Sequence, residues 1–399
     1  MLSASAPAPG GPSASGRRLA TPARAVVLAL VLALVATAGA RAQEIYLAFG
    51  DSITEGVGDD PARAEKGYPP RLEALLQAAG RNAVVVNSGI EGETTAEGIS
   101  RINGVIAATD ADVLLLMEGT NDIPLVSNET VQRNLQEIAR RAAALGVTTI
   151  HSTLFPRHNT AGLDPNNDQT AQASGLIREL AYETNRRLAD PFEVFFNIPN
   201  VFTLYFPPGD KFHPNAAGYD RMAQIWFEVI QGIDRVPPVV GRMRPLDKSE
   251  NVAPGTNISI DLYDFGAGIN LSRTSIRIDG ETVNATLRGD NRKVEVVYQP
   301  PSPLRGVVDV DLVSEDLANP VNAVDRRVSR FIVSGTTFLN GDTNRDGRVD
   351  GGDLVRLAIA FGASRGEPRY LASADLNSDN LIDGSDLAIL ASNFGKESG

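Results

Sequence analysis

The chain has 399 residues, of which 42% are hydrophobic and 22% are charged, and its formal net charge is -12 at pH 7. This composition excludes a wholly disordered chain, and the length allows two or three folded domains. An acidic chain lacks the basic patch of a nucleic-acid binder, so no nucleic-acid partner is expected. Cysteine is absent, so the fold must be stabilised by its core, with bound ions as a further means.

Residues 1–42 have the parts of a secretory signal peptide. An arginine-bearing stretch precedes the apolar run 25–38, and Ala40-Arg41-Ala42 has the small-x-small form of a signal peptidase site. We therefore expect a secreted, extracellular protein, which could also be held at the cell surface; the export route, general secretory or twin-arginine, stays open. A membrane anchor is the alternative, but the run is shorter than the roughly 20 residues of a spanning helix, so no stable membrane span is expected.

In residues 43–234, apolar segments alternate with amphipathic ones. The alternation predicts a parallel sheet between two layers of helices, an α/β/α three-layer domain of flavodoxin-like order, whose active site lies beyond the carboxyl ends of the strands. The strands are expected to be short, apolar and rich in β-branched or aromatic residues: "EIYLAF", "NAVVVN", "DVLLLM", "VTTIHSTLF" and "FEVFFNI". Helices are predicted over 68–79, 95–107, 129–145, 169–188 and 214–231.

A proline-rich linker, "DRVPPVVGRMRP", leads into residues 237–334, where apolar and polar positions alternate. This pattern predicts an all-β sandwich, and the segments "DFGAGI" and "EDLANP" resemble bacterial immunoglobulin-like modules. The region carries no catalytic constellation, so we interpret it as a spacer or weak ligand binder. A calcium site at the turn of Asp264 is the alternative to plain turn chemistry. Strands are predicted at "NISIDLY", "SIRIDG", "KVEVVYQ", "GVVDVDLV" and "VSRFIV".

The last region, residues 336–399, contains a duplication. The segment "GDTNRDGRVDGGDLVRLAIAFG" aligns without a gap to "ADLNSDNLIDGSDLAILASNFG". Each repeat places oxygen-bearing side chains at loop positions 1, 3, 5 and 12 and a backbone carbonyl at position 7, which is the spacing by which an EF-hand loop binds Ca²⁺. Two calcium sites are therefore expected, with ligands from Asp342, Asn344, Asp346, Arg348 and Asp353, and from Asp375, Asn377, Asp379, Leu381 and Asp386.

After each loop, apolar residues recur at helical spacing, and we expect them to pack against one another across the duplication. A unit this small has a limited core, so we expect bound ions to stabilise its fold. An acidic solvated tail, the alternative, explains neither the period nor the apolar positions. Asn380 stands where the first loop has Gly347, and Asn tolerates the left-handed conformation, so the second site is expected to be kept. The apolar positions are Leu354, Leu357, Ala358 and Phe361, then Leu387, Leu390, Ala391 and Phe394.

The paired loops, each with Asp at position 12 and with no helix before the first, resemble a type I dockerin. This resemblance implies a module that docks onto cohesins, so a cohesin-bearing protein is a candidate partner.

Ser52, in "YLAFGDSITEG", lies between the first predicted strand and a turn. A serine in a turn is often only turn chemistry, and a nucleophilic serine requires a base, a group that orients the base, and donors for the oxyanion. The segment "DKFHPNAAGY" supplies Asp210 and His213 within one tight turn. Asp210 can accept from one imidazole nitrogen so that the other faces Ser52.

Four segments, "FGDSITEG", "NSGIEGET", "EGTND" and "DKFHPNAAG", occur in the order of the motif blocks of the GDSL, or SGNH, hydrolases, so residues 44–231 resemble that family. The resemblance implies that Ser52 is the nucleophile, His213 the general base and then acid, and Asp210 the group that orients His213. It implies no cofactor for catalysis. The chain has no G-x-S-x-G elbow and no glycine-rich phosphate loop with a lysine after the first strand, which disfavours an α/β-hydrolase or a nucleotide site.

The same resemblance implies an oxyanion hole formed by the backbone amides of Ser52 and Gly92 and the side-chain amide of Asn121. Glycine permits a close backbone approach, and Asn121 follows the predicted strand "DVLLLM" at the same sheet edge as Ser52. Taken singly, Asn121 could be a helix cap and Gly92 a loop former. Each of the four candidate residues lies at the end of a predicted strand or just before a helix, which argues that they form a site. They are Ser52, Gly92, Asn121 and His213.

The sequence thus predicts a secreted serine esterase joined through an immunoglobulin-like spacer to a calcium-binding dockerin. An acyl group on a polysaccharide is one candidate substrate, and lipid or short-chain esters fit the motifs equally well. The alternative is a non-catalytic secreted assembly or adhesion protein. The expected domains are the signal peptide 1–42, the hydrolase 43–234, the sandwich 237–334 and the dockerin 336–399.

Overall fold

The computed structural model describes residues 43–123, 125–157, 165–196, 198–335, 339–365, 367, 369–371 and 373–397. The signal peptide expected over 1–42 lies outside these residues. Across the described ranges, no helix combines the length and the apolar character needed to cross a membrane.

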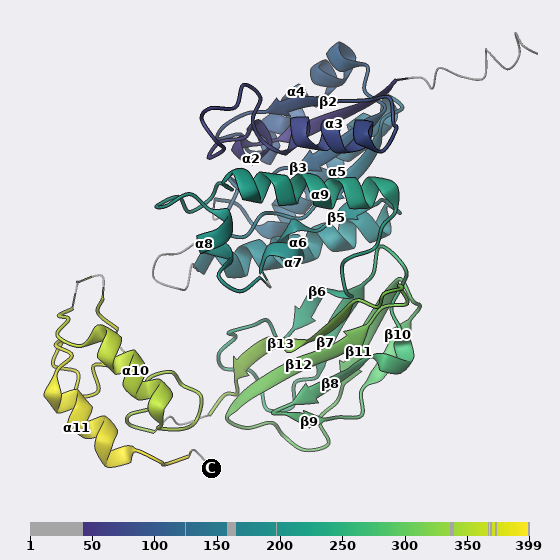
Figure 1. Ribbon diagram of the computed structural model, residues 1–399. Coiled ribbons are helices and arrows are strands. Elements are labelled where there is room, and N and C mark those ends of the chain that lie inside the picture. Colours follow the sequence, from purple (N-terminus) through teal and green to yellow (C-terminus); the bar gives the residue numbers. More distant parts are fainter. Residues whose placement is uncertain are drawn as a thin grey trace, which may run out of the picture. The chain divides into compact units, whose positions relative to one another are not determined.

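The first region contains a five-stranded, all-parallel sheet with the strand order β2-β1-β3-β4-β5 (Figure 1). This is the flavodoxin-like order, and it confirms the expected topology. The central strand β1 has β2 on one side and β3 on the other, so the loops that follow these three strands are neighbours. The strands are β1 (Glu44–Gly50), β2 (Ala83–Gly89), β3 (Val113–Met117), β4 (Thr148–Ser152) and β5 (Leu188–Ala189).

Helices cover both faces of this sheet because successive strand residues point to opposite sides. Tyr46 and Ala48 of β1 join one core with residues of α3 and α9, whereas Leu47 and Phe49 join a second core with residues of α4, α5 and α6. The three-layer expectation is confirmed, with helix ends shifted by a few residues. The helices are α3 (Tyr68–Ala78), α4 (Thr95–Thr109), α5 (Asn128–Ala144), α6 (Pro165–Glu183) and α9 (Ala216–Gln231).

The strand predicted at "FEVFFNI" is wrong, because this segment begins with the helix α7 (Pro191–Phe196). Asp190 accepts a hydrogen bond from the backbone of Glu193 at 3.0 Å, as an N-cap does, and a proline at the first helical position is preset for the turn. Phe192 and Phe195, three residues apart, are buried. The apolar run therefore has helical spacing, and the last strand is the short β5 before it.

Residues 239–332 contain two four-stranded antiparallel sheets, with the orders β10-β11-β7-β6 and β13-β12-β8-β9. Alternate residues of β12 are buried, and they share one core with the inward residues of both sheets. The five predicted strands are confirmed, and β6, β9 and β10 were not foreseen; β6 lies within the segment that the sequence analysis interpreted as a linker. The strands are β6 (Val239–Arg244), β7 (Ile258–Tyr263), β8 (Ser275–Ile278), β9 (Glu281–Thr282), β10 (Thr286–Gly289), β11 (Lys293–Tyr298), β12 (Val307–Glu315) and β13 (Ala323–Ile332).

Each C-terminal repeat is a loop followed by a helix, α10 (Gly351–Ala360) and α11 (Gly384–Asn393). Of the eight apolar positions expected to pack together, only Leu357 and Leu390 are buried in a shared core, so the prediction is wrong for the other six. The core is completed instead by Val349 and Ile382, at position 8 of the two loops. Their backbones bond to the segment that follows the helix of the other repeat. One apolar face of each helix is exposed. The misassigned exposed residues are Leu354, Ala358, Phe361, Leu387, Ala391 and Phe394.

Candidate active site

Ser52 is the first residue of the short helix α2 (Ser52–Glu55), which begins directly beyond the carboxyl end of β1. Asp51 is the N-cap, and its Oδ1 accepts a hydrogen bond from the backbone of Ile53 at 3.0 Å. Burial raises the pKa of Asp51 to about 6. The Gly-Asp-Ser turn is therefore a helix cap that places the serine side chain, which is itself buried, at the edge of the sheet.

A hydrogen-bonded chain joins Ser52 to His213 and Asp210, although Ser52 and His213 are 161 positions apart. The Ser52 Oγ lies 3.0 Å from Nε2 of His213, and Nδ1 of the same ring lies 2.9 Å from Oδ2 of Asp210. The other oxygen of Asp210 accepts from the backbone amides of Phe212 at 2.8 Å and His213 at 3.0 Å. Burial raises the pKa of Asp210, but these amides and the imidazole outweigh it, so the pKa lies below its usual value.

Contacts that we did not single out from the sequence hold His213 in place. Asn215 is the N-cap of α9, accepting from Gly218, and its side-chain amide also donates to the carbonyl of Leu204 at 3.0 Å, after which the chain turns toward Asp210. Gly58 has φ +89°, and a Cβ there would lie 2.8 Å from Cβ of His213. The Asn-Ala-Ala-Gly cap was legible in "HPNAAGY", whereas the role of Gly58 appears only when the two loops meet.

Gly92 and Asn121 lie on the loops after β2 and β3, the strands that flank β1. Gly92 has φ +79°, a conformation that favours glycine, with no atom crowding the position of a Cβ. The side-chain amide of Asn121 donates to the carbonyl of Glu93 at 2.9 Å, so the two loops are joined beside Gly92. Asp122 accepts from the backbone and hydroxyl of Thr95 at 2.9 and 2.6 Å, which secures this turn on the start of α4.

An ion pair beneath these loops joins Arg101 of α4 to Glu93. The guanidinium also donates to the hydroxyl and the carbonyl of Ser88, both at 2.8 Å, and lies 3.8 Å from the ring centroid of Phe49. Together with the Asn121 bond, the contacts of Arg101 hold Ser88 and Glu93, which lie before and after Gly92 in the chain.

Glu118, the first residue after β3, is fully buried next to this pair. Burial raises its pKa to about 10, and the negative charges of Glu93 and Asp51 add to the shift. The carboxyl group is therefore uncharged at neutral pH.

Arg157, on the segment after β4, is buried and connects two of the site's loops. Its guanidinium donates to the carbonyls of Thr120 and Ile123, and it lies 5.1 Å from the ring centroid of Phe212, the residue before His213. The partly exposed ring of Phe212 is thus held beside the imidazole.

The C-terminal loops carry the expected oxygen donors. In the first loop, Asp342, Asp346 and Asp353 each offer an oxygen within 4.8 Å of the others. Among the described residues, the corresponding aspartates of the second loop do not form so close a group, and the Tyr370 hydroxyl donates to Asp375 at 2.6 Å. These hard oxygens fit Ca²⁺.

The two loops share their hydrogen-bond pattern. The amides of Asp346 and Asp379 donate to the first aspartate of their loops at 3.0 and 3.1 Å. The amides of Gly347 and Asn380 donate to the other oxygen of that aspartate, both at 2.9 Å. Asn380 has φ +71°, as expected for a residue that replaces glycine in this loop.

Comparison with known proteins gives two family matches. Residues 48–221 match the GDSL-like lipase/acylhydrolase family, and residues 340–394 match the dockerin type I domain. Among individual proteins, the chain is 30% identical over 128 residues to esterase TesA of Pseudomonas aeruginosa. The match covers 32% of this chain and 62% of the relative. The chain is 32% identical over 96 residues to an arylesterase of Vibrio mimicus, covering 24% and 46%.

A multidomain esterase of Ruminococcus flavefaciens is 25% identical over 225 residues, which cover 46% of this chain and 28% of that protein. The chain thus spans less than two thirds of the length of each of these relatives. Among solved structures, a catalytic mutant of Axe2, an acetylxylan esterase from Geobacillus stearothermophilus, is 26% identical with a TM-score of 0.40, covering 47% of this chain and 94% of that one. Residues 48–221 therefore belong to the GDSL-like lipase/acylhydrolase family, and residues 340–394 form a type I dockerin domain.

Proposed function

We propose that this protein hydrolyses carboxylic esters by acyl transfer through Ser52, His213 and Asp210. The observation that carries the proposal is the chain of contacts from the Ser52 hydroxyl to the imidazole at 3.0 Å and from the imidazole to Asp210 at 2.9 Å. A base within hydrogen-bond reach is what a serine needs to become a nucleophile at neutral pH. The family of residues 48–221 supports the same chemistry.

In the proposed cycle, the Ser52 oxygen attacks the ester carbonyl while His213 Nε2 takes the hydroxyl proton. The same proton passes to the departing alcohol, which leaves an acyl group on Ser52. Water then gives a proton to His213 and attacks the acyl carbon, and the acid is released as Ser52 recovers its proton. Asp210 keeps the Nδ1–H tautomer of the ring and stabilises the imidazolium.

Each tetrahedral intermediate places a negative charge on the former carbonyl oxygen. We assign its stabilisation to the amides of Ser52 and Gly92 and to the side chain of Asn121. Asn121 has a second N–H besides the one bonded to Glu93, so it can serve both purposes.

For the substrate, we propose an acetyl or other acyl ester on a polysaccharide. The support is the dockerin, because a module that attaches an esterase to a cohesin-bearing assembly suits a large, immobile substrate better than a diffusing one. Lipid and short-chain esters are the competing substrates. A chain-length series of nitrophenyl esters, assayed beside acetylated xylan, distinguishes them by kcat/KM.

We further propose that the C-terminal loops bind two calcium ions and that the dockerin docks onto a cohesin. The support for docking is an exposed apolar surface, since Val355 and Ile359 of α10 are 60% and 64% exposed and Phe394 after α11 is 54% exposed. Capture of the full chain by an immobilised cohesin, and its loss on chelation, tests the docking.

Two other regions complete the proposal. We assign residues 237–334 as an immunoglobulin-like spacer and residues 1–42 as the signal that directs export.

The test of the esterase is labelling with a fluorophosphonate, which reacts with activated serines. Wild-type protein should be labelled, Ser52→Ala should not be, and His213→Ala should be labelled at a greatly reduced rate. Ser100→Ala, an exposed serine on α4, is the matched control and should behave as wild type. Labelling that survives in Ser52→Ala would remove Ser52 from the proposed chemistry. A folded wild-type protein that is not labelled and turns over no ester of the series would favour the non-catalytic assembly or adhesion protein.

A further inference from the structure

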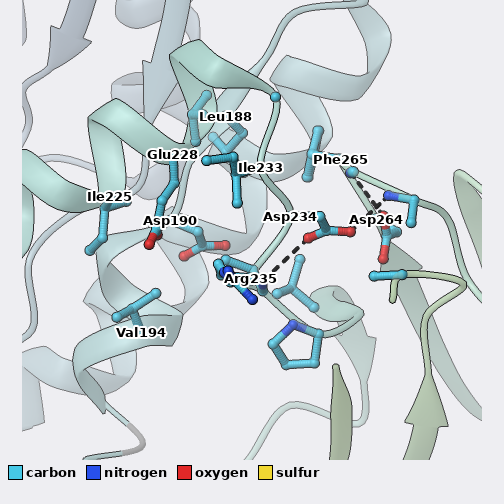
Figure 2. A pocket seen from close by; sticks show the side chains of 18 of the residues that line it. Leu188, Asp190, Val194, Ile225, Glu228, Ile233, Asp234, Arg235, Asp264 and Phe265 are labelled. Carbon is cyan, nitrogen blue, oxygen red and sulfur yellow. Dashed lines mark hydrogen bonds between the residues drawn. The ribbon is translucent and has the colours of Figure 1, made fainter. Parts of the chain in front are cut away.

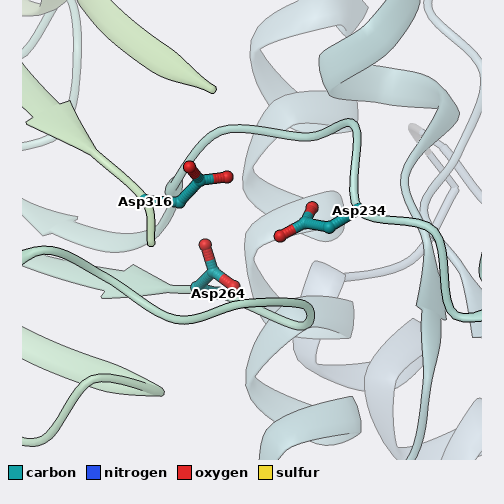
Figure 3. Close-up of side chains that lie close together, drawn as sticks. All are labelled: Asp234, Asp264 and Asp316. Carbon is teal, nitrogen blue, oxygen red and sulfur yellow. The ribbon is translucent and has the colours of Figure 1, made fainter. Parts of the chain in front are cut away.

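Three aspartates outside both sites described above lie together where the chain passes from α9 into the β-sheets. Asp234 lies between α9 and β6, Asp264 follows β7, and Asp316 follows β12 (Figure 3). One carboxylate oxygen from each lies within 4.8 Å of the others. Asp264 and Asp316 are only 4% and 1% exposed. Such a cluster of buried like charges is costly unless something compensates it.

The surrounding loops hold these carboxylates in place. Asp264 Oδ1 accepts from the backbone amides of Gly266 and Gly268 at 2.9 and 2.8 Å. Asp234 Oδ2 accepts from the amide of Ala267, in the same loop, at 2.7 Å. The loop after β7 is therefore bonded to the segment that leaves α9.

Asp316 is held in the same manner by its own loop. Its Oδ1 accepts from the amides of Ala318 and Asn322 at 3.1 and 2.8 Å, and its Oδ2 accepts from the Asn322 side chain at 2.5 Å. These donors fix the direction of each carboxylate, but they are neutral and leave three formal negative charges together.

A second observation indicates that a ligand is needed. Asp264 Oδ2 is buried and has no hydrogen-bond partner, although the side chain is 96% buried and turned toward Asp234 and Asp316 (Figure 3). Among the ion pairs of the described residues, none involves any of the three aspartates. Turn chemistry explains Oδ1 of Asp264, which has two amide donors, but it does not explain Oδ2.

The donor set decides which ligand fits. All donors are hard carboxylate oxygens from loops, which suits Ca²⁺; zinc prefers nitrogen and sulfur, and magnesium demands a near-ideal octahedron. Asp234 and Asp264 also line a cavity of about 610 Å³, which provides access and room for water to complete the coordination (Figure 2).

We propose that Asp234, Asp264 and Asp316 form a calcium site that ties the segment leaving α9 to two loops of the antiparallel sheets. It is separate from the dockerin loops. Calcium there neutralises the cluster and stabilises the junction between the esterase region and the sheets. The proposal does not depend on the esterase activity.

The test uses the full chain with the dockerin loops disabled by Asp342→Ala and Asp375→Ala. After chelation, calorimetric titration with CaCl₂ should still show uptake of about one ion per chain, and calcium should raise the melting temperature. Asp264→Asn in this background should remove both effects. Asp290→Asn is the matched control, because Asp290 also accepts two backbone amides in a turn but lies outside the cluster, and it should keep them.

The same variants separate a metal site from a purely structural turn. If calcium compensates the cluster, Asp264→Asn removes a buried charge and should melt in EDTA at or above the temperature of its parent. Asp234→Asn, at the less buried member, should weaken calcium uptake in the same way. No calcium uptake by the dockerin-disabled parent, or a melting temperature that EDTA leaves unchanged, would overturn the proposal.

Discussion

The two ends of this chain build their sites in opposite ways. The groups around Ser52 come from segments up to 161 positions apart, and the hydroxyl, the imidazole and the Asp210 carboxylate already bond to one another within the protein. The first dockerin loop draws Asp342, Asp346 and Asp353 from twelve consecutive residues, and their carboxylates face one another. The first arrangement is complete without a ligand and depends on the fold around it. The second is local and depends on a cation.

The largest expected effect comes from removing the nucleophile of the site around Ser52. Ser52→Ala should lower kcat/KM for a nitrophenyl ester by about 10⁴-fold or more, because no other group can form the acyl intermediate. The melting temperature should change little, since the hydroxyl makes one hydrogen bond. Retention of a tenth of the wild-type rate would remove Ser52 from the chemistry.

Substitution at Asn121 should cost less than loss of the nucleophile. Asn121→Ala should lower kcat by on the order of 10²-fold, the usual cost of one oxyanion donor. If Asn121 only pinned Glu93, KM and stability would change and kcat would not. Asn134→Ala is the control. It removes a side-chain hydrogen bond to Thr95, and its kcat should stay within a few fold of the wild-type value.

Chelation sharpens the comparison, because it should affect the C-terminal region and spare catalysis. EDTA should abolish cohesin capture and reduce the helical signal of the dockerin, since three carboxylates then repel one another without a counter-ion. Hydrolysis of a small ester should stay within about two-fold of the untreated rate. A parallel loss of ester hydrolysis at room temperature would show that the two regions are not independent.

The smallest effect concerns the buried carboxyl of Glu118. Its folded-state pKa of about 10 lies above the unfolded value, so unfolding is favoured increasingly as pH rises from about 4.5 toward 10. Glu118→Gln does not titrate, and its melting temperature relative to wild type should rise between pH 5 and pH 9. The pKa of Glu97 is lowered by its bonds to Thr94, so Glu97→Gln should show no such gain. A difference independent of pH would contradict the assignment.

The sequence alone was sufficient for features whose physics is local. Continuous apolar runs marked four of the five parallel strands. The twelve-residue spacing pointed to Asp342, Asp346 and Asp353, whose oxygens lie within 4.8 Å of one another, because the residues of such a loop lie in one stretch of the sequence. Asp190-Pro191 is also a local signal, and overlooking this cap turned α7 into a strand. The resemblance of four motif blocks named Ser52, Asp210 and His213 before any distance was known.

Only the tertiary structure decided which distant segments meet. The burial of Val349 and Ile382 in place of six of the expected helix residues follows from backbone pairing between repeats, which no periodicity within one helix reveals. The contact of Gly58 with His213 is of the same kind. So is the convergence of Asp234, Asp264 and Asp316. The sequence offered a calcium site at the turn of Asp264 only as an alternative to turn chemistry and gave no sign of the other two aspartates, because the cost of gathering buried charge arises only when the segments come together.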